Sequence, residues 1–427
     1  MSPKHPVDLQ SDNLIRPFAA LMPTHEYADK VAAPPYDVIS EREARALAED
    51  NPWHFLHVSR PEIDFPAGTD PYQDVVYERA ADNLRRMMEE DILKRQSRPG
   101  YYVYELGSGN HVQTGIAAVS SLRAYEEGRI RRHELTRPQK ENDRVRHMEI
   151  IDAQTGPVFL VCPASDPLTD LLARLRKAAP DLDIKTQDGV RHTIRVVSAP
   201  DDIVAISQHF AAMESLYVAD GHHRSAAAAR VAKTRRAANS GHTDIRPYDF
   251  FLTVIFPADQ VRILDYNRVV ELDGLSRSDF LRRVSEVFLV IPSDHPVQPA
   301  ARNEFGLYLP GNWYRLRLPE DRIPEDPVGG LATSLLTDRV LDPILGIRDL
   351  RRDRRIDFVG GIRGLGELER LVDARETAAA FSLYPTRISE LLAVADAGLL
   401  MPPKSTWFEP KLADGLLSYV LDSRAFS

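Results

Sequence analysis

The sequence has a single cysteine, no apolar run long enough to span a membrane, and fewer basic than acidic residues. The lone Cys162 excludes an internal disulfide and a structural zinc site built from several thiolates. Because Cys162 stands in the apolar run 158–162, we expect a small buried side chain there rather than a nucleophile. The N-terminus also lacks an apolar core of signal-peptide length, so the sequence predicts a cytoplasmic protein with no membrane partner.

The formal net charge of −9 and the isoelectric point near 5.8 disfavour a nucleic-acid-binding surface, because phosphate backbones are held mainly by basic faces. Local basic clusters occur at 129–133 and 348–355. Aspartates interrupt the second cluster, which favours a solvated face of ion pairs. The 43% hydrophobic and 27% charged residues are typical of a globular enzyme, and 427 residues favour two lobes.

The alternation of apolar periodicity and turn residues predicts a mixed α/β (α+β) architecture. We expect a flexible tail at 1–13, a main catalytic region at 14–270, and a C-terminal α/β region at 271–427 that packs back on the core. Ser40, with Glu43 three residues later, predicts a helix that begins with a capping box. The expected strands include 55–58, the hairpins 101–106 with 112–119 and 304–309 with 313–318, and 250–256 paired with 261–264.

The stretch 216–232 carries the densest chemistry in the chain. Its first four residues are apolar, Asp220 and Gly221 form a breaker pair, and the alanine-rich run that follows favours a helix. A strand that enters a helix through glycine presents unpaired backbone N–H groups and the positive end of the helix dipole, and the two histidines and Arg224 add donors. The pattern therefore predicts a phosphate-binding turn. The alternative is that the histidines are solvated and Asp220 only caps the helix.

Three further windows combine polar side chains with irregular backbone. In 34–39, two prolines hold Tyr36 and Asp37 in a stiff loop, which suits either a binding-site wall or a surface connector. The window 132–144 is a loop followed by a helix that begins near Lys140, and it suits either a catalytic loop or a solvated charged loop. In 398–411, prolines exclude regular structure while two aromatic residues need burial. This segment is either a structural strap or one that presents polar side chains inward.

Asp-Gly-His-His-Arg at 220–224, followed by a small-residue helix, resembles the hallmark of the domain-of-unknown-function 1015 family. The segments 34–39, 133–144 and 403–411 resemble the same family. The turn is also similar to the Gly-x-x-Arg phosphate-binding turn of the ParB/sulfiredoxin superfamily, whose members include free-serine kinases. That resemblance implies that Gly221 and Arg224 hold nucleotide phosphates. The two histidines between them depart from the ParB pattern, which disfavours a DNA-partitioning role.

The resemblance implies a ParB/sulfiredoxin-like core with an additional α/β lobe. It further implies a small-molecule kinase that phosphorylates free L-serine with ATP or ADP and Mg²⁺. No residue pattern by itself selects serine. The candidate residues for binding the nucleotide are Gly221, His222, Arg224, Ser225, Lys140, Arg144 and Lys404. The candidate catalytic residues are Asp220, which is also the candidate metal ligand, His223, and Glu134 or Asp37 as the base.

Two other functions remain open from the residues. A metal-dependent hydrolase would use His133, His222, His223 and Asp220 as ligands, although the chain has no helical His-x-x-x-His pair. A non-catalytic regulator would bind the nucleotide without turnover. In each case the expected ligands are small molecules, and a homodimer is compatible with the sequence.

Overall fold

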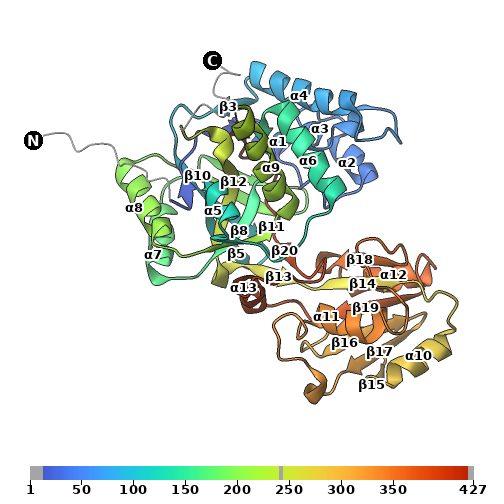
Figure 1. Cartoon of the computed structure of the whole chain (residues 1–427). Helices are drawn as coiled ribbons and strands as arrows, with labels where there is room; N and C mark the ends of the chain where they lie inside the picture. The colour runs from blue at the N-terminus through green and yellow to red at the C-terminus, as the bar shows by residue number, and fades with distance from the viewer. Residues whose placement is uncertain (1–12, 240–243, 422–427) are drawn as a thin grey trace, which may run out of the picture. The chain divides into compact units, whose positions relative to one another are not determined.

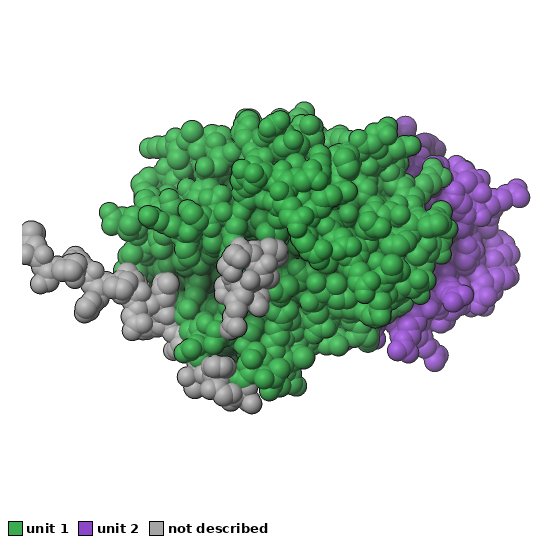
Figure 2. All heavy atoms as spheres, turned by 90° about the horizontal axis from the view of Figure 1, so that it is seen from above, with its two compact units in different colours: residues 1–131, 136–261, 410–427 green, residues 132–135, 262–409 purple. Residues whose placement is uncertain are grey.

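The structure is a computed structural model that describes residues 13–239 and 244–421. The predicted tail at 1–13 therefore lies outside the described residues except for its last member. The chain forms two compact units, which Figure 2 colours separately. Unit 1 contains the described residues up to Arg131, Thr136–Val261, and those from Pro410 onward, and unit 2 contains Arg132–Leu135 and Arg262–Glu409. The sequence instead placed all of 271–427 in one C-terminal region.

Unit 1 is built on a mixed sheet that has nine strands among the described residues, in the order β6-β11-β8-β12-β5-β4-β10-β9, with β1 also paired to β5. The pairs β6/β11 and β8/β12 are parallel, and the others are antiparallel. These strands are β1 (Ile15–Arg16), β4 (Tyr101–Ser108), β5 (His111–Ser121), β6 (Ile130–Arg131), β8 (Val158–Cys162), β9 (Leu182–Lys185), β10 (Arg191–Val197), β11 (Leu216–Asp220) and β12 (Phe250–Pro257). The central strand β12 is buried along its whole length, as its uniformly apolar sequence predicts.

The helices of unit 1 include three that pack side by side, α4, α6 and α9 (Figure 1). The α-helices are α1 (Ala28–Val31), α2 (Glu41–Ala48), α3 (Leu56–Ser59), α4 (Asp74–Glu89), α5 (Leu122–Glu126), α6 (Pro138–Ile151), α7 (Asp166–Leu175), α8 (Pro200–Ala211) and α9 (His222–Ala238). Short elements complete the unit: β2 (Leu21–Pro23) with β3 (Leu93–Arg95), β7 (Ala153–Gln154) with β21 (Tyr419–Val420), and the turns η1 (Pro61–Asp64), η2 (Pro247–Asp249) and η3 (Ala258–Gln260). The predicted capping box is present at α2, where the Glu43 backbone N–H donates to Ser40 Oγ at 3.2 Å.

Unit 2 has an antiparallel sheet with six strands among the described residues, in the order β15-β17-β16-β19-β14-β18. These strands are β14 (Tyr266–Val270), β15 (Leu289–Ser293), β16 (Glu304–Leu309), β17 (Asn312–Arg317), β18 (Ile356–Gly360) and β19 (Ala379–Leu383). The remaining elements are α10 (Arg277–Ser285), α11 (Ala332–Leu336), α12 (Leu365–Asp373), α13 (Ile388–Asp396), the strands β13 (Arg262–Leu264) and β20 (Trp407–Glu409), and the turns η4 (Glu320–Arg322), η5 (Thr337–Leu341) and η6 (Gly361–Arg363). The hairpin β16/β17 matches its prediction.

Three local predictions are wrong. Residues 55–58 form part of helix α3 and its N-cap rather than a strand, and Phe55, Leu56 and Val58 are all fully buried there. Strand β13 pairs with β20 rather than with β12, since η3 redirects the chain after β12. The same pairing gives regular structure to 407–409, where the neighbouring prolines suggested none. Within the described residues, no helix combines the length and the apolar character that a membrane span needs.

Candidate functional site

The turn between β11 and α9 has the backbone geometry that the sequence predicts. Gly221 adopts φ +95°, which side chains other than glycine rarely allow, and it directly precedes α9. A Cβ atom at Gly221 would lie 3.1 Å from Arg224 Nε and 3.3 Å from Val158 Cα. Glycine is therefore required both for the turn and for the close approach of Arg224. The turn directs the first N–H groups of a 17-residue helix toward one point, which is the geometry of an anion site.

Asp220 is held as a carboxylate at the end of β11. Its Oδ1 accepts a hydrogen bond from the Gly221 N–H at 2.7 Å, and its Oδ2 accepts one from Lys411 Nζ at 2.9 Å. Burial alone would raise the pKa of Asp220, but the charges of Lys411 and Arg224 outweigh burial and lower the pKa well below its usual value. Lys411 lies in the C-terminal segment that was expected to be either a structural strap or a segment that presents polar side chains inward. Asp220 therefore stays ionised across the physiological pH range.

Arg224 points back from the first turn of α9 toward the strand β8. Its Nη1 donates to the Pro157 carbonyl oxygen at 2.7 Å, whereas its buried Nε has no hydrogen-bond partner among the described residues. Burial lowers the pKa of Arg224, but Asp37, Asp220 and other acidic groups raise it above its usual value. The guanidinium is thus a fixed cation with one donor available for a ligand.

The proline-stiffened loop contributes Tyr36 to the same region. Arg60 Nη1 donates to the carbonyl oxygens of Tyr36 at 3.0 Å and Ile39 at 2.7 Å, which fixes the loop from α3. The Tyr36 ring lies against Arg144, whose guanidinium carbon is 4.0 Å from the ring centroid. Burial raises the pKa of Tyr36 strongly, and its hydroxyl has no hydrogen-bond partner among the described residues. Asp37 is exposed on the same loop.

Arg144 is oriented by an acidic neighbour on its own helix. Arg144 donates from Nε and Nη2 to Asp143 Oδ2 at 3.0 and 2.9 Å, and Asp143 Oδ1 accepts a hydrogen bond from the Tyr77 hydroxyl at 2.8 Å. Burial alone would lower the pKa of Arg144, but Asp143 and Tyr36 raise it by more, so the pKa lies above its usual value. The α6 pattern at 140–144 therefore supplies a largely buried, charged arginine, and its predicted role in nucleotide binding remains a prediction.

A small cavity of about 30 Å³ joins these groups. Its lining includes Tyr36, Arg144, Arg224 and Asp414, together with Gly156. A Cβ atom at Gly156 would lie 2.9 Å from Asp414 Oδ1 and 3.2 Å from Arg224 Nη1, so this position also needs glycine. The cavity has room for one or two waters or for a single small polar group. Three buried polar atoms face this region without a partner among the described residues, namely Tyr36 Oη, Arg224 Nε and Asp414 Oδ1.

Asp414 is the acidic group in this cluster whose pKa lies closest to neutrality. Its side chain is 2% exposed, and its backbone pairs with that of Ala33, which places it beside the proline-stiffened loop. Burial raises the pKa of Asp414 to about 7, although Arg224 acts to lower it. A carboxyl group of this kind can hold or release a proton at physiological pH.

The raised pKa of Asp414 predicts a measurable pH dependence of stability. A carboxyl group with a higher pKa in the folded than in the unfolded protein stabilises the fold fully below pH 3.8, its usual pKa, and this contribution is lost as pH rises through about 7. Asp414→Asn cannot ionise, so its free energy of unfolding should exceed that of the wild type increasingly from pH 5 to pH 8. We expect that difference to grow by about 2–3 kcal/mol. Urea unfolding of both proteins at the two pH values measures it, and a constant difference would contradict the assignment.

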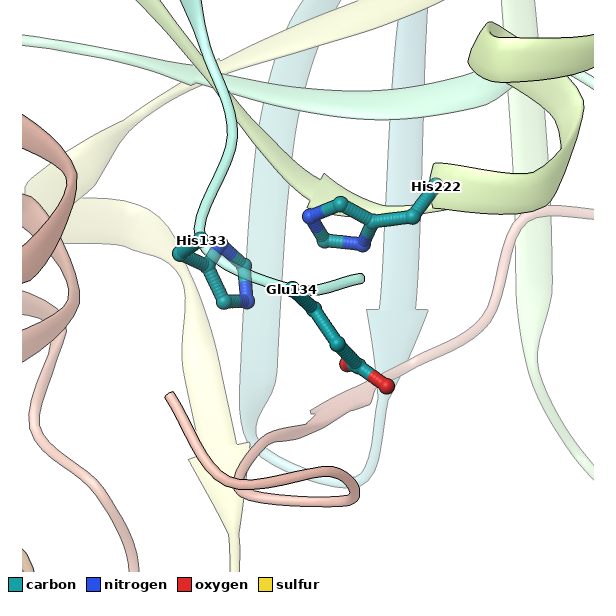
Figure 3. A group of neighbouring side chains, drawn as sticks. All are labelled: His133, Glu134 and His222. Atoms are coloured by element: carbon teal, nitrogen blue, oxygen red, sulfur yellow. The ribbon is translucent and has the colours of Figure 1, made fainter. Parts of the chain in front are cut away.

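Other candidate residues of the turn lie within unit 1. His222 is buried, and Figure 3 shows it at the start of α9. His223 is partly buried. Burial raises the pKa of Glu141, but Thr136, Arg230 and, to a smaller extent, His223 lower it to a net decrease. Ser225 is fully buried, and its Oγ donates to the His222 carbonyl oxygen at 3.1 Å and lies 3.3 Å from the Tyr125 hydroxyl. Lys140 is exposed in the first turn of α6.

Two candidate residues belong to unit 2. Glu134 follows His133 on the short segment Arg132–Leu135, and Figure 3 draws both side chains on that segment. The His133 carbonyl oxygen accepts a hydrogen bond from the Met401 N–H at 2.8 Å. Lys404 has φ +63°, and its Nζ lies 5.4 Å from the Tyr266 ring centroid. The roles proposed for Glu134 and Lys404 remain predictions.

The sequence analysis gave no role to two acidic residues of the site, Asp143 and Asp414. Asp143 lies inside the Lys-x-x-Asp-Arg pattern, so the motif held a signal that could have found it. Asp414 lies three residues beyond the C-terminal polar segment, and no motif singles it out. Its position is visible only once the backbone pairing with Ala33 is known.

The chain belongs to the DUF1015 family, which is described as a protein of unknown function, and the family model matches residues 15–340. The resemblance inferred from the motif at 220–224 is thereby confirmed. The matched range ends before 403–411, whose resemblance remains a prediction. None of the curated proteins matches the chain.

Several solved structures resemble the chain distantly. A conserved hypothetical protein from Pyrococcus furiosus is 12% identical, with 70% of this chain and 93% of that chain covered and a TM-score of 0.35. A free serine kinase in complex with AMP is 12% identical, with 68% and 86% covered and a TM-score of 0.34. SbnI with a C-terminal truncation, from Staphylococcus aureus, is 10% identical, with 70% and 86% covered and a TM-score of 0.37.

Proposed function

We propose that this protein is a phosphotransferase that moves a phosphoryl group from a nucleotide to the hydroxyl group of a small molecule. The observation that carries this proposal is the buried Arg224 Nε, a donor without a partner among the described residues, beside the Gly221 turn that opens α9. A fixed cation and the N-terminus of a long helix together favour a bound phosphate. Free L-serine is the acceptor to test first, because the turn is similar to that of a superfamily that includes free-serine kinases.

The residues present fit the phosphate chain of ATP or ADP, which would supply the phosphoryl group when bound, with Mg²⁺ to bridge the phosphates. Gly221 and the first turn of α9 would bind phosphate oxygens through backbone N–H groups, with His222 and His223 beside them. Arg224 and Arg144 would balance the negative charge. Ser225 has its hydroxyl bonded inside unit 1, so its contribution would be its backbone N–H group and its packing.

Two carboxyl groups are candidates to accept the proton of the attacking hydroxyl. Asp37 is exposed on the stiff loop and acts electrostatically on Arg224. Asp414 has a pKa of about 7, which suits a group that must both accept and release a proton near neutral pH. Asp220 would orient the site through Lys411 and remains the candidate metal ligand, since each of its oxygens keeps a lone pair beyond the hydrogen bonds described above.

The geometry within unit 1 favours a phosphotransferase over a metal-dependent hydrolase. The cationic groups around Asp220, which are Arg224 and, at 2.9 Å from Asp220 Oδ2, Lys411, favour an anionic ligand at this turn. A phosphate chain carries negative charge, and the arginines and Lys411 favour it. A non-catalytic regulator would use the same residues for binding and would show no product.

The proposal is tested by incubating the purified full-length protein with Mg²⁺, either ATP or ADP, and a pool of hydroxyl-bearing amino acids that includes L-serine. Mass spectrometry should detect one product that is heavier than its acceptor by one phosphate. Separate reactions with each nucleotide identify the donor, and single acceptors identify the substrate. Saturable binding of nucleotide with no product on any acceptor would overturn the phosphotransferase and leave the regulator.

A further inference from the structure

Unit 2 contains a groove that is independent of the site described above. Its volume is about 570 Å³, which is within the range of pockets that hold small organic ligands. The lining residues come from α10, from the turns η4 and η5, and from the segments that follow β17 and η5. They are Arg282, Arg283, Glu286, Val287, Leu318, Arg322, Asp338, Arg339, Pro343 and Ile344. Four arginines and two acidic residues give the groove a positive balance.

Most of this positive charge is not neutralised within the unit. Arg282 pairs with Glu286 at 2.9 Å, but Arg283, Arg322 and Arg339 form no ion pair within the part of the chain that the structure describes. Arg339 Nη2 donates to the Arg322 carbonyl oxygen at 3.3 Å, and its buried Nε has no hydrogen-bond partner among the described residues. Like charges gathered in one concave surface repel one another unless an anion binds between them.

Arginines elsewhere in unit 2 behave differently. Arg315 and Arg317 both pair with Glu304, at 3.0 and 2.5 Å. Arg355 pairs with Asp353 at 2.7 Å, and Arg370 pairs with Glu367 at 2.8 Å. These four arginines therefore have acidic partners, whereas the three groove arginines form no ion pair among the described residues.

The groove also has an apolar wall and an unusual backbone. Leu318 is fully buried, and Val287 and Ile344 are partly buried against the core of unit 2. Arg339 lies on η5, a π-helical turn in which the Asp342 N–H bonds to the Thr337 carbonyl oxygen at 3.0 Å. Single π-helical turns within helices are rare and are frequent at functional sites. Here the turn carries Arg339, one of the residues that line the groove.

We propose that this groove binds an organic phosphate, with its phosphate between Arg283, Arg322 and Arg339 and its apolar part against Val287 and Ile344, which Leu318 supports from behind. Guanidinium groups suit phosphate oxygens because their N–H donors form parallel charge-assisted hydrogen bonds. The apolar wall adds affinity for a ligand that carries a ring or chain beside its phosphate. The groove is a second ligand site, separate from the turn at Gly221.

Isothermal titration calorimetry of the full-length protein with 1-naphthyl phosphate tests the proposal. The double variant Arg283→Gln, Arg322→Gln should bind the probe about a hundredfold more weakly than the wild type or worse, since each of the two lost charged hydrogen bonds contributes about tenfold or more in affinity. Arg277→Gln is the matched control, because it removes an exposed positive charge from the same helix α10 outside the groove, and it should bind normally. Uncharged 1-naphthol should bind weakly to all three proteins.

The same titration with the Arg224→Gln variant distinguishes binding in the groove from binding at the Gly221 turn. Binding to the groove should persist there and should still be weakened by the double variant. Equal affinity in the wild type and the double variant, or complete loss of binding in Arg224→Gln alone, would overturn the groove as a ligand site. Inorganic phosphate that binds as tightly as 1-naphthyl phosphate would exclude a role for the apolar wall.

Discussion

Phosphoryl transfer by the Arg224→Gln variant is expected to fall by about a hundredfold or more, because the substitution removes the fixed cation beside the Gly221 turn. Glutamine is two atoms shorter than arginine, so its amide group lies near the position of Arg224 Nε and loses the hydrogen bond that Arg224 Nη1 donates to the Pro157 carbonyl oxygen at 2.7 Å. The variant keeps an N–H donor near the position of Nε, but it lacks the positive charge of the guanidinium. The expected loss is therefore one of electrostatic stabilisation more than of packing. Nucleotide affinity should fall in parallel if Arg224 contacts the phosphates of the bound nucleotide.

The measurement is the rate of product formation, together with nucleotide binding and thermal unfolding for each variant. Lys233→Gln is the matched control, since it removes an exposed positive charge from the same helix α9. It should retain wild-type activity. An Arg224→Gln variant that is folded and fully active would place the chemistry elsewhere. A parallel drop in both variants would show that activity follows the general charge of α9 instead of Arg224.

The strand-to-helix turn was predictable because its determinants are local. An apolar run, a glycine that tolerates positive φ, and an alanine-rich run decide the path of the chain at 216–232 without help from distant segments. The capping box at Ser40 and the hairpin β4/β5 follow for the same reason. These features are encoded within a few residues, so the sequence alone is sufficient to infer them.

The errors arise where distant segments decide the local structure. Residues 55–58 are apolar enough for either a strand or a helix, and no local signal favours the observed helix α3. Strand β13 pairs with β20, which lies more than a hundred residues away, so a prediction based on the nearest turn chose the wrong partner. Short apolar runs are therefore the least certain part of such a prediction.

The residues of the candidate site divide in the same way, into those that a local motif reveals and those that only the folded structure reveals. Asp220, Gly221 and Arg224 belong to one motif and were found together. Asp414 enters the cavity only because its backbone pairs with Ala33 at the other end of the chain. Its functional feature is a pKa raised by burial, and burial is a property of the folded protein that no local pattern encodes.

The segment that carries Asp414 leads directly to a second large effect, at Gly415. This residue adopts φ +86°, and a Cβ atom there would lie 2.6 Å from Phe55 Cγ and 2.7 Å from Phe55 Cδ2. Phe55 is fully buried in a core cluster with Leu21 and Val31, so it cannot move aside without displacing that core. Gly415→Ala should therefore lower the free energy of unfolding by about 3–5 kcal/mol, from backbone strain and overpacking together.

Gly68→Ala separates the two causes. Gly68 has nearly the same φ, +84°, but no atom lies within 4 Å of the Cβ position, so alanine there should show the backbone strain alone, on the order of 1 kcal/mol. Urea unfolding of both variants measures the difference, and equal losses would contradict a clash with Phe55. Because Gly415 follows Asp414 directly, a shift of the backbone at this position also moves the carboxyl group of Asp414 relative to Arg224. Gly415→Ala should then weaken the pH dependence of stability that Asp414 produces between pH 5 and pH 8, whereas Gly68→Ala should leave it intact.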